Sequence, residues 1–218
     1  QVRDYTRVDA IVISHMHADH FFDLIPYAFA LVYAPRQQPV PVARWSGTDE
    51  PVRPPLYLPP NGLAIINDMA GAIGAGDLIE HAFDVHEYDP DQPLRIGALD
   101  LRFQPVPHFV DTWAIEFAGG GRRFVFGADC RPNDEIVEFA RDADLLMLES
   151  TLPRPERTGM RGHLTPGEAG EHADRAGVKR LVLMHISDEL DRLWAEAEAK
   201  NAFAGPVAVA AEGAIFTV

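Results

Sequence analysis

The stretch Ser14-His15-Met16-His17-Ala18-Asp19-His20 directly follows a short apolar run rich in β-branched residues, which spans positions 9–14. Such a run is typical of a strand buried on both faces, and α/β folds place their ligand sites at the carboxyl ends of such strands. Three imidazoles and one carboxylate within six residues add little to packing, but they are ordinary ligands of a metal ion. We therefore interpret residues 15–20, the histidine cluster, as the floor of a metal site.

The composition limits the class of protein. The chain has 218 residues, of which 47% are hydrophobic, so we expect a single domain over residues 1–218 with a substantial core. Nineteen Lys and Arg against 33 Asp and Glu give a formal charge of −14, which argues against binding of extended nucleic acid through its phosphates. The single cysteine, Cys130, excludes an internal disulfide framework and fits a reducing compartment. No apolar run has the length of a membrane span and no signal peptide opens the chain, so we expect a cytoplasmic protein without membrane contact.

The region after the histidine cluster contains a helix and then a proline-rich excursion. Apolar residues recur at helical spacing from Asp19 to about Leu31, and Pro26 interrupts them, which predicts a kink or a short first turn. Eight of the 18 prolines fall in residues 35–60, so residues 33–60 are interpreted as an irregular loop. Two views of this loop stay open: a solvated loop, or one whose Tyr33 and Trp45 wall a substrate pocket or form a subunit contact.

The rest of the chain predicts alternating strands and helices. Strands are expected at residues 56–58, 83–88, 99–106, 112–117, 122–126, 144–149, 181–184 and within 207–218. Helices are expected at residues 61–73, 133–141 and 188–200, and from a capping box at Thr165 to about Gly177. A strand-rich first half followed by alternating strands and helices predicts an α/β sandwich.

Further ligand candidates stand at the ends of predicted strands. His108, Asp129 and His185 each follow an apolar strand and have nothing apolar to pack against. A lone histidine in such a place is usually structural, but three such residues beside the histidine cluster favour a metal site. Together these are too many ligands for one ion and suit two ions bridged by a carboxylate. Imidazole and carboxylate donors without thiolate suit Zn²⁺, Mn²⁺ or Fe.

The pattern His15-x-His17-x-Asp19-His20, with Gly127-Ala128-Asp129 and the later His185, resembles the metallo-β-lactamase superfamily. The resemblance runs from about Val8 to the C-terminus and implies a four-layer αββα sandwich, with two mixed sheets flanked by helices. The family's initial strand pair and its Asp-Cys-Gly-like turn do not precede the cluster, so we expect the sandwich to lack those N-terminal strands. The resemblance implies two divalent ions, Zn²⁺ ahead of Mn²⁺ or Fe. One ion would be held by His15, His17 and His108 and the other by Asp19, His20 and His185, with Asp129 bridging them.

One more histidine, His163, indicates which branch of the superfamily the chain resembles. The segment Arg161-Gly162-His163-Leu164-Thr165 is similar to the ribonuclease Z and phosphodiesterase branch. There such a histidine stabilises the scissile phosphate and assists the leaving group, whereas β-lactamases and glyoxalase-type thioesterases lack it. A position just before a helix also favours an anionic ligand. The alternative is a surface residue without function.

The spacing between two candidate ligands points to a small substrate. Ribonuclease Z carries a long tRNA-gripping arm between its third histidine and its bridging aspartate. Here residues 109–128, which are 20 residues, separate His108 from Asp129. The motifs His17-Ala18-Asp19-His20 and Phe83-Asp84-Val85-His86 are similar to motifs of the atypical cyclic-nucleotide phosphodiesterases. The resemblance therefore implies a dinuclear-metal phosphodiesterase for small anionic phosphodiesters, in which Asp19 orients the attacking water or accepts its proton and His163 assists the departing oxygen.

Other functions stay open on the same residues. One is a ribonuclease Z-like RNA endonuclease, another is a lactone or thioester hydrolase, which would not need His163. An iron-dependent redox enzyme and a non-catalytic fold kept for protein contacts complete the set. Relatives of this kind are commonly dimers, so the resemblance also leaves a homodimer open.

Several residues receive a structural interpretation. Cys130 is predicted to be a small buried filler. Glu149, at the end of a strand, is a candidate for orienting a metal-bound histidine. The remaining histidines are expected to be surface or strand residues without ligand roles: His81, His86 and His172.

Overall fold

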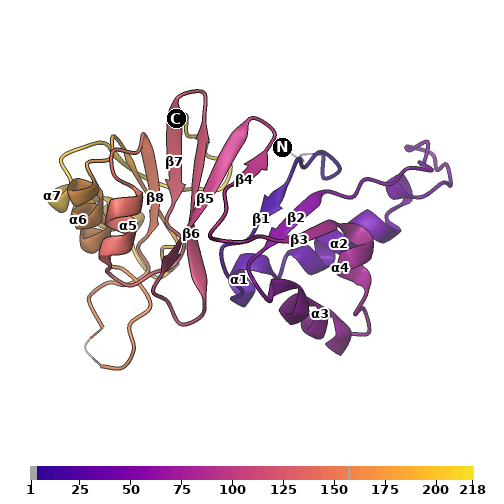
Figure 1. Cartoon of the computed structure of the whole chain (residues 1–218), viewed down its shortest axis with the longest axis horizontal. Helices are drawn as coiled ribbons and strands as arrows, with labels where there is room; N and C mark the ends of the chain where they lie inside the picture. Colours follow the sequence, from indigo (N-terminus) through magenta and orange to yellow (C-terminus); the bar gives the residue numbers. More distant parts are fainter. Residues whose placement is uncertain (1–3, 157) are drawn as a thin grey trace. The chain divides into compact units, whose positions relative to one another are not determined.

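The computed structural model describes residues 4–156 and 158–218. Two compact units divide the chain, an N-terminal unit of residues 1–89 and a C-terminal unit of residues 90–218 (Figure 1). The single domain expected for residues 1–218 stays a prediction. Each unit has its own sheet, its own helices and its own hydrophobic core.

The N-terminal unit is built on a three-stranded parallel sheet of order β1-β2-β3, with bounds Ile11–Val12, Pro55–Leu58 and Asp84–Glu87. Parallel neighbours need long crossover connections, and the helices of the unit supply them. They are α1 (Ala18–Phe21), α2 (Leu24–Tyr33), the 3₁₀ turn η1 (Pro35–Gln37), α3 (Gly62–Ala72) and α4 (Leu78–Ala82). The expectation of two mixed sheets is therefore wrong for the described strands of this unit, all of which run parallel. Its core contains Leu56, Leu58, Ile66 and Phe83.

The helix predicted from Asp19 to about Leu31 is two helices. The first helix, α1, ends at Phe21, and α2 begins at Leu24. Pro26 lies in the first turn of α2, where a backbone N–H would have no intrahelical partner. The four-residue α1 matches the predicted short first turn, and Pro26 lies in the first turn of α2 without kinking a long helix.

The proline-rich excursion is anchored at its base. The buried amide of Gln37 donates to the carbonyl oxygens of Leu31 at 3.3 Å and Val52 at 3.0 Å, so it joins the two ends of the loop. Trp45 lies under the Arg36 guanidinium, 4.9 Å from its ring centroid, and both Trp45 and Tyr33 are exposed. A pocket wall or a subunit contact made by these two rings stays a prediction.

The C-terminal unit is built on a seven-stranded mixed sheet of order β10-β9-β8-β7-β6-β5-β4. The strands are β4 (Leu94–Ile96), β5 (Leu99–Val106), β6 (Thr112–Gly119), β7 (Arg122–Phe126), β8 (Leu145–Glu149), β9 (Leu181–Met184) and β10 (Val207–Val209). Neighbours from β4 to β7 are antiparallel and those from β7 to β10 are parallel. The helices are α5 (Asp134–Phe139), α6 (Pro166–Ala176) and α7 (Arg192–Ala202).

Local signals set most element ends of this unit. The side chain of Asn133 caps α5, and the predicted capping box of Thr165 and Glu168 opens α6. The last helix begins at Arg192 after an Asp191 cap, later than the expected residue 188. Strands are also shorter than expected at the C-terminus, and the sequence pattern missed two short elements, α4 and β4.

The direction of the strands decides where the site lies. Strands β7, β8 and β9 run parallel, and β5 runs the same way because two antiparallel pairings separate it from β7. Their carboxyl ends therefore share one edge of the sheet. Four residues stand at or just after these strand ends, and we call this the catalytic edge: His108, Asp129, Glu149 and His185.

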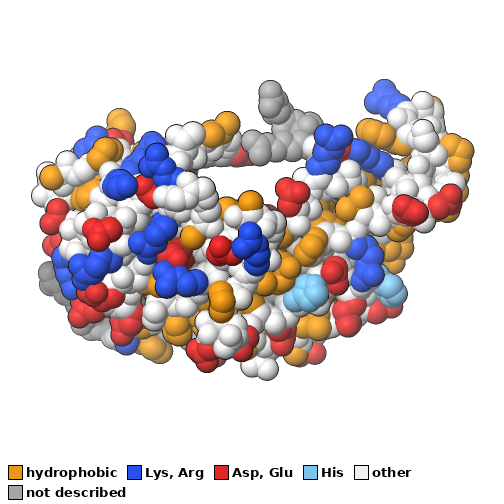
Figure 2. All heavy atoms as spheres, turned by 45° about the horizontal axis from the view of Figure 1, so that its top comes forward, with side chains coloured by type: hydrophobic (Ala, Val, Ile, Leu, Met, Phe, Trp, Pro, Cys, Tyr) orange, Lys and Arg blue, Asp and Glu red, His pale blue; other side chains and the backbone are white. Residues whose placement is uncertain are grey.

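The only cysteine of the chain lies in the core of the C-terminal unit. Cys130 is fully buried in its hydrophobic core, which confirms the prediction of a buried filler, and burial raises the pKa of its thiol. Figure 2 shows acidic and basic side chains interspersed over the visible face of this unit. Among residues 4–156 and 158–218, the helices are all too short or too polar to cross a lipid bilayer.

One histidine expected at the surface or in a strand is buried in a helix. His172 lies in α6, where Nδ1 donates to the carbonyl oxygen of Glu168 at 2.7 Å and Nε2 accepts from the Asn133 N–H at 3.1 Å. The imidazole therefore joins the start of α5 to α6, which the sequence pattern did not show. Burial lowers the pKa of His172, so the neutral ring is favoured in the folded protein.

We expect His172→Leu to lower the free energy of unfolding by about 1–3 kcal/mol at pH 7.5, because the Asn133 N–H loses its acceptor. The folded pKa of His172 lies below its unfolded value near 6.5, so unfolding takes up a proton below that pH. The contribution of His172 is full above pH 6.5 and falls as the pH drops towards the folded pKa. Urea unfolding at pH 7.5 and 5.5 should show the difference between wild type and variant shrinking. An unchanged difference, with exposed His81→Leu as the control, would show that His172 is not a neutral acceptor.

Candidate metal centre

The histidine cluster lies directly after β1, in a loop whose backbone is held on both sides. The N–H of Ile13 donates to the Tyr57 carbonyl oxygen at 2.9 Å, and its own carbonyl oxygen accepts from the Tyr88 hydroxyl at 3.0 Å. His15 is fully buried, and its Nδ1 lies 3.0 Å from the hydroxyl of Ser14. The sequence signal of a strand followed by ligands therefore corresponds to a loop anchored by hydrogen bonds.

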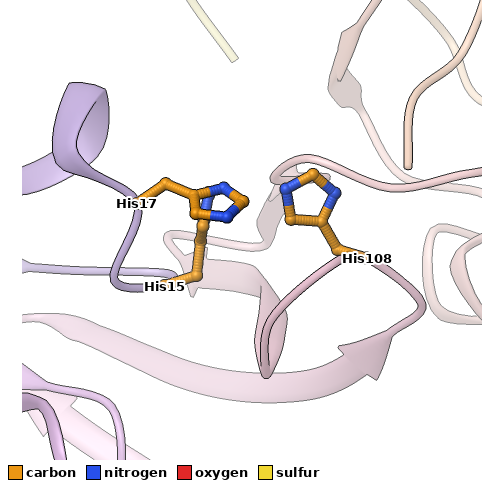
Figure 3. Close-up of side chains that lie close together, drawn as sticks. All are labelled: His15, His17 and His108. Carbon is orange, nitrogen blue, oxygen red and sulfur yellow. The ribbon is translucent and has the colours of Figure 1, made fainter. Parts of the chain in front are cut away.

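The imidazoles of the cluster are gathered around His15. Its ring centroid lies 5.0 Å from that of His17 and 4.0 Å from that of His20. Figure 3 shows the side chains of His15 and His17, which leave the same loop. His17 is the N-cap of α1, which places Asp19 in the first turn, with its carboxylate 3.5 Å from His20 Nε2. The short helix thus presents a carboxylate and an imidazole next to the two loop histidines.

In the C-terminal unit, His108 lies just after the end of β5 (Figure 3). Its Nδ1 lies 2.8 Å from the carbonyl oxygen of Gly162. A carbonyl only accepts, so His108 carries its proton on Nδ1, which leaves the Nε2 lone pair for a ligand bond. Ligating histidines characteristically donate their other ring nitrogen to a carbonyl or carboxylate in this way.

Asp129 and His185 follow β7 and β9 along the same catalytic edge. Asp129 is buried, and its Oδ2 lies 3.5 Å from His185 Nε2. Ala128 and His185 both have left-handed backbone, with φ of 54° and 49°. A residue other than glycine is uncommon there, and such conformations concentrate at active sites. The strained backbone supports a functional role for this edge.

A buried carboxylate, Glu149 at the end of β8, anchors the middle of the catalytic edge. Its Oε1 accepts from the Cys130 N–H at 3.1 Å and lies 2.9 Å from His163 Nδ1. Its Oε2 accepts from the Thr151 N–H at 3.1 Å and from the Thr151 hydroxyl at 2.9 Å. The direct imidazole partner of Glu149 is therefore His163 and not one of the predicted metal ligands.

Thr151 extends this arrangement to a predicted ligand. Its hydroxyl lies 2.7 Å from His185 Nδ1 and 2.9 Å from Glu149 Oε2. With the proton of His185 on Nδ1, the hydroxyl accepts from the ring and donates to the carboxylate. Glu149 thus orients His163 directly and His185 through Thr151. Glu149 was a sequence candidate for such a role, whereas Thr151 carried no signal beyond its place two residues further on.

His163 lies in the loop before α6 and is surrounded by the catalytic edge. Its Nδ1 is 3.8 Å from Asp129 Oδ2, and its ring centroid lies 5.0 Å from that of His108 and 5.6 Å from that of His185. Burial lowers the pKa of His163, but the hydrogen bond to Glu149 and the nearby carboxylate charges outweigh burial and raise it overall. The interpretation of His163 as an isolated surface residue therefore does not fit its surroundings.

Arg161 holds the loop that carries His163. Its Nε donates to the carbonyl oxygen of His163 at 3.0 Å, and its guanidinium pairs with Glu168 of the capping box. The capped helix start and the His163 backbone are therefore one hydrogen-bonded assembly. This explains why the sequence motif contains an arginine two residues before the histidine.

Within the C-terminal unit the donor set fits a divalent metal ion. In the C-terminal unit, donor atoms lie within 4.8 Å of one another in two groups: His108, Asp129 and His163, and Glu149, His163 and His185. The Nδ1 atoms of His15, His108 and His185 all face an oxygen of a neighbouring residue. Imidazole and carboxylate donors oriented in this way suit zinc, manganese or iron.

Comparisons with known proteins agree with these features. Residues 1–186 match the family model of the beta-lactamase superfamily domain. The probable metallo-hydrolase YhfI of Bacillus subtilis is 29% identical over 96% of this chain and 79% of its own. The crystal structure of YhfI, a metallo-β-lactamase fold protein, gives a TM-score of 0.80 at 25% identity and covers 98% of this chain and 79% of that one.

Two further proteins are similar to this chain. Ribonuclease Z of Halorubrum lacusprofundi is 28% identical over 97% of this chain and 81% of its own. Unliganded yeast PDE1 shares the fold, with a TM-score of 0.65 at 12% identity over 94% of this chain and 67% of its own. The chain belongs to the beta-lactamase superfamily. It has the metallo-β-lactamase fold expected from the sequence and is a metal-dependent hydrolase.

Proposed function

We propose that this hydrolase is a dinuclear-metal phosphodiesterase acting on small phosphodiesters such as cyclic nucleotides. The observation that carries the proposal is the pair of His163 and the buried Glu149, whose atoms Nδ1 and Oε1 lie 2.9 Å apart. A lactone or thioester has no anionic phosphate for such an imidazole to contact. A phosphodiester presents both a negative phosphoryl oxygen and a poor leaving group.

The ligand assignment rests on the family pattern and on the geometry inside each unit. His15, His17 and His108 would hold one ion, Asp19, His20 and His185 the other, and Asp129 would bridge them. The bound ions would supply Lewis acidity and an activated water near neutral pH. The donor set does not distinguish Zn²⁺, our preferred ion, from Mn²⁺ or Fe.

Two side chains of the protein would carry out the proton transfers, one at the attacking water and one at the departing oxygen. The exposed carboxylate of Asp19 orients the attacking water and accepts its proton. Glu149 holds His163 Nδ1, so Nε2 is the nitrogen that contacts the phosphoryl or the departing oxygen. His163 donates a hydrogen bond or a proton there, which stabilises the charge that develops as the P–O bond breaks.

A ribonuclease Z-like RNA endonuclease is the second candidate, because the Halorubrum relative is a ribonuclease Z. Against it, residues 109–128 form the plain hairpin of β6 and β7 between His108 and Asp129. The formal charge of −14 also disfavours contacts along an RNA backbone. A small diester therefore fits this chain better than an extended one.

A substrate panel tests the proposal. Protein loaded with Zn²⁺ or Mn²⁺ should hydrolyse bis-p-nitrophenyl phosphate and 3′,5′-cyclic AMP, with γ-butyrolactone and a tRNA precursor left intact. Protein treated with a chelator is the control and should be inactive. Mass spectrometry of the metal content should give two ions per chain. Hydrolysis of the lactone or the precursor alone would overturn the proposal, and one ion per chain would overturn its dinuclear part.

A further inference from the structure

The side chain of Phe109 lies beside two histidines at the catalytic edge. Its ring centroid lies 5.1 Å from that of His108 and 5.9 Å from that of His163. One histidine is a predicted metal ligand and the other the predicted partner of the phosphate. Phe109 is therefore adjacent to the reacting group without being able to take part in the chemistry.

The ring of Phe109 packs directly on the backbone of the His163 loop. It lies against the backbone of Gly162, where an added Cβ would come within 2.1 Å of a ring carbon. That is far inside the 3.5–4.0 Å at which carbon atoms pack. The carbonyl oxygen of the same glycine holds His108, so ring and ligand share one backbone support. This contact also explains the glycine of the Arg161-Gly162-His163 motif.

Much of this ring is nevertheless open to solvent. Phe109 is 44% exposed, and the next residue in the chain, Val110, is 38% exposed. Residues 105–113 line a shallow hollow of about 250 Å³ here. This is below the roughly 300–1,000 Å³ of a pocket that encloses a whole ligand. The hollow thus suits one flat group of a larger molecule.

We infer that Phe109 is a specificity-determining residue that stacks on an aromatic ring of the substrate, a nucleobase. The inference rests on the proposed function and narrows its substrates to phosphodiesters of nucleosides. A base against an exposed aromatic side chain is a sequence-tolerant contact, since every base has a π-face. The phosphate would then lie towards His163 and the base towards the hollow.

The test compares two ligands that share a phosphate and differ in the base, AMP and ribose 5-phosphate. Calorimetric titration of metal-loaded wild type should show AMP binding the tighter. Phe109→Leu keeps the apolar bulk and removes the π-face, so it should weaken AMP roughly tenfold and ribose 5-phosphate less than about twofold. Phe109→Trp should retain the preference for AMP. Leu99→Ala, a similarly exposed apolar residue at the opposite end of β5 and outside the hollow, should change neither ligand.

Equal losses for both ligands in Phe109→Leu, or a wild type that does not prefer AMP, would overturn the inference. Thermal unfolding of each variant shows whether it is folded. Phe109→Trp keeps an aromatic face, so it distinguishes loss of stacking from a general effect of changing this residue. The two proposals fail separately. Hydrolysis of diesters with no base preference contradicts only the role of Phe109. A Phe109-dependent base preference without diester hydrolysis supports that role and contradicts the phosphodiesterase.

Discussion

Replacement of His163 by alanine is expected to lower the turnover of 3′,5′-cyclic AMP, whose leaving group is a poorly acidic hydroxyl, by roughly 100- to 10,000-fold, the range of a lost general acid. The side chain is oriented by Glu149, and the two imidazoles nearest to it, His108 and His185, are predicted metal ligands. The predicted ligands His108, Asp129 and His185 are untouched, and the metal content should stay that of the wild type. Steady-state kinetics with metal analysis of the same sample measures both.

Two comparisons make this result specific. His86→Ala removes an exposed histidine of β3 in the N-terminal unit and should keep full activity. His163→Gln can still donate a hydrogen bond but no proton, so activity between alanine and wild type would indicate phosphate binding in addition to proton donation. Wild-type turnover in His163→Ala would refute the role of this residue.

We expect Glu149→Gln to lower kcat by roughly 10- to 100-fold, the usual cost of losing a group that orients an active-site histidine. The amide keeps the volume of the side chain but replaces one acceptor oxygen with a donor. In Glu149 one carboxylate oxygen accepts from His163 Nδ1 and the Cys130 N–H, and the other accepts from the Thr151 hydroxyl. The glutamine has one acceptor oxygen, so it cannot accept all three hydrogen bonds. KM should change little, because the altered group orients His163 and does not itself hold the phosphate.

A double variant distinguishes orientation from a general structural effect. If Glu149 acts through His163, then Glu149→Gln combined with His163→Ala should be about as slow as His163→Ala alone. Assays at saturating metal remove any loss of metal affinity that passes through Thr151 and His185. Glu135→Gln, an exposed carboxylate in the first turn of α5, is the control. Independent, multiplying losses would show that Glu149 does not work through His163.

Much of the C-terminal unit follows from local signals. The caps at Asn133 and Thr165 depend on neighbouring residues only, and the structure has both. The alternation of strands and helices also identifies most elements of its sheet. The errors lie where local and tertiary preferences differ: Pro26 begins a helix, and α4 and β4 are too short for a periodic pattern.

The site divides in the same way. Residues 15–20 form a signal within six residues, so residue types and their spacing are enough to predict the family and its metal chemistry. His108, Asp129 and His185 could be proposed because each follows an apolar strand. Thr151 and Phe109 could not, since their importance comes from neighbours that are far away in the sequence, at His185 and Gly162.

The sequence by itself determined the superfamily and the donor chemistry, and it singled out His163, on which the proposal of phosphodiester over acyl hydrolysis rests. These depend on residue type and short spacing, which a chain carries without folding. Only the tertiary structure decided which groups orient one another: the contact of Glu149 with His163, its link through Thr151 to His185, and the seat of Phe109 on Gly162. These contacts join residues far apart in the sequence, which come together here because strands that run the same way bring their carboxyl ends to one edge of the sheet.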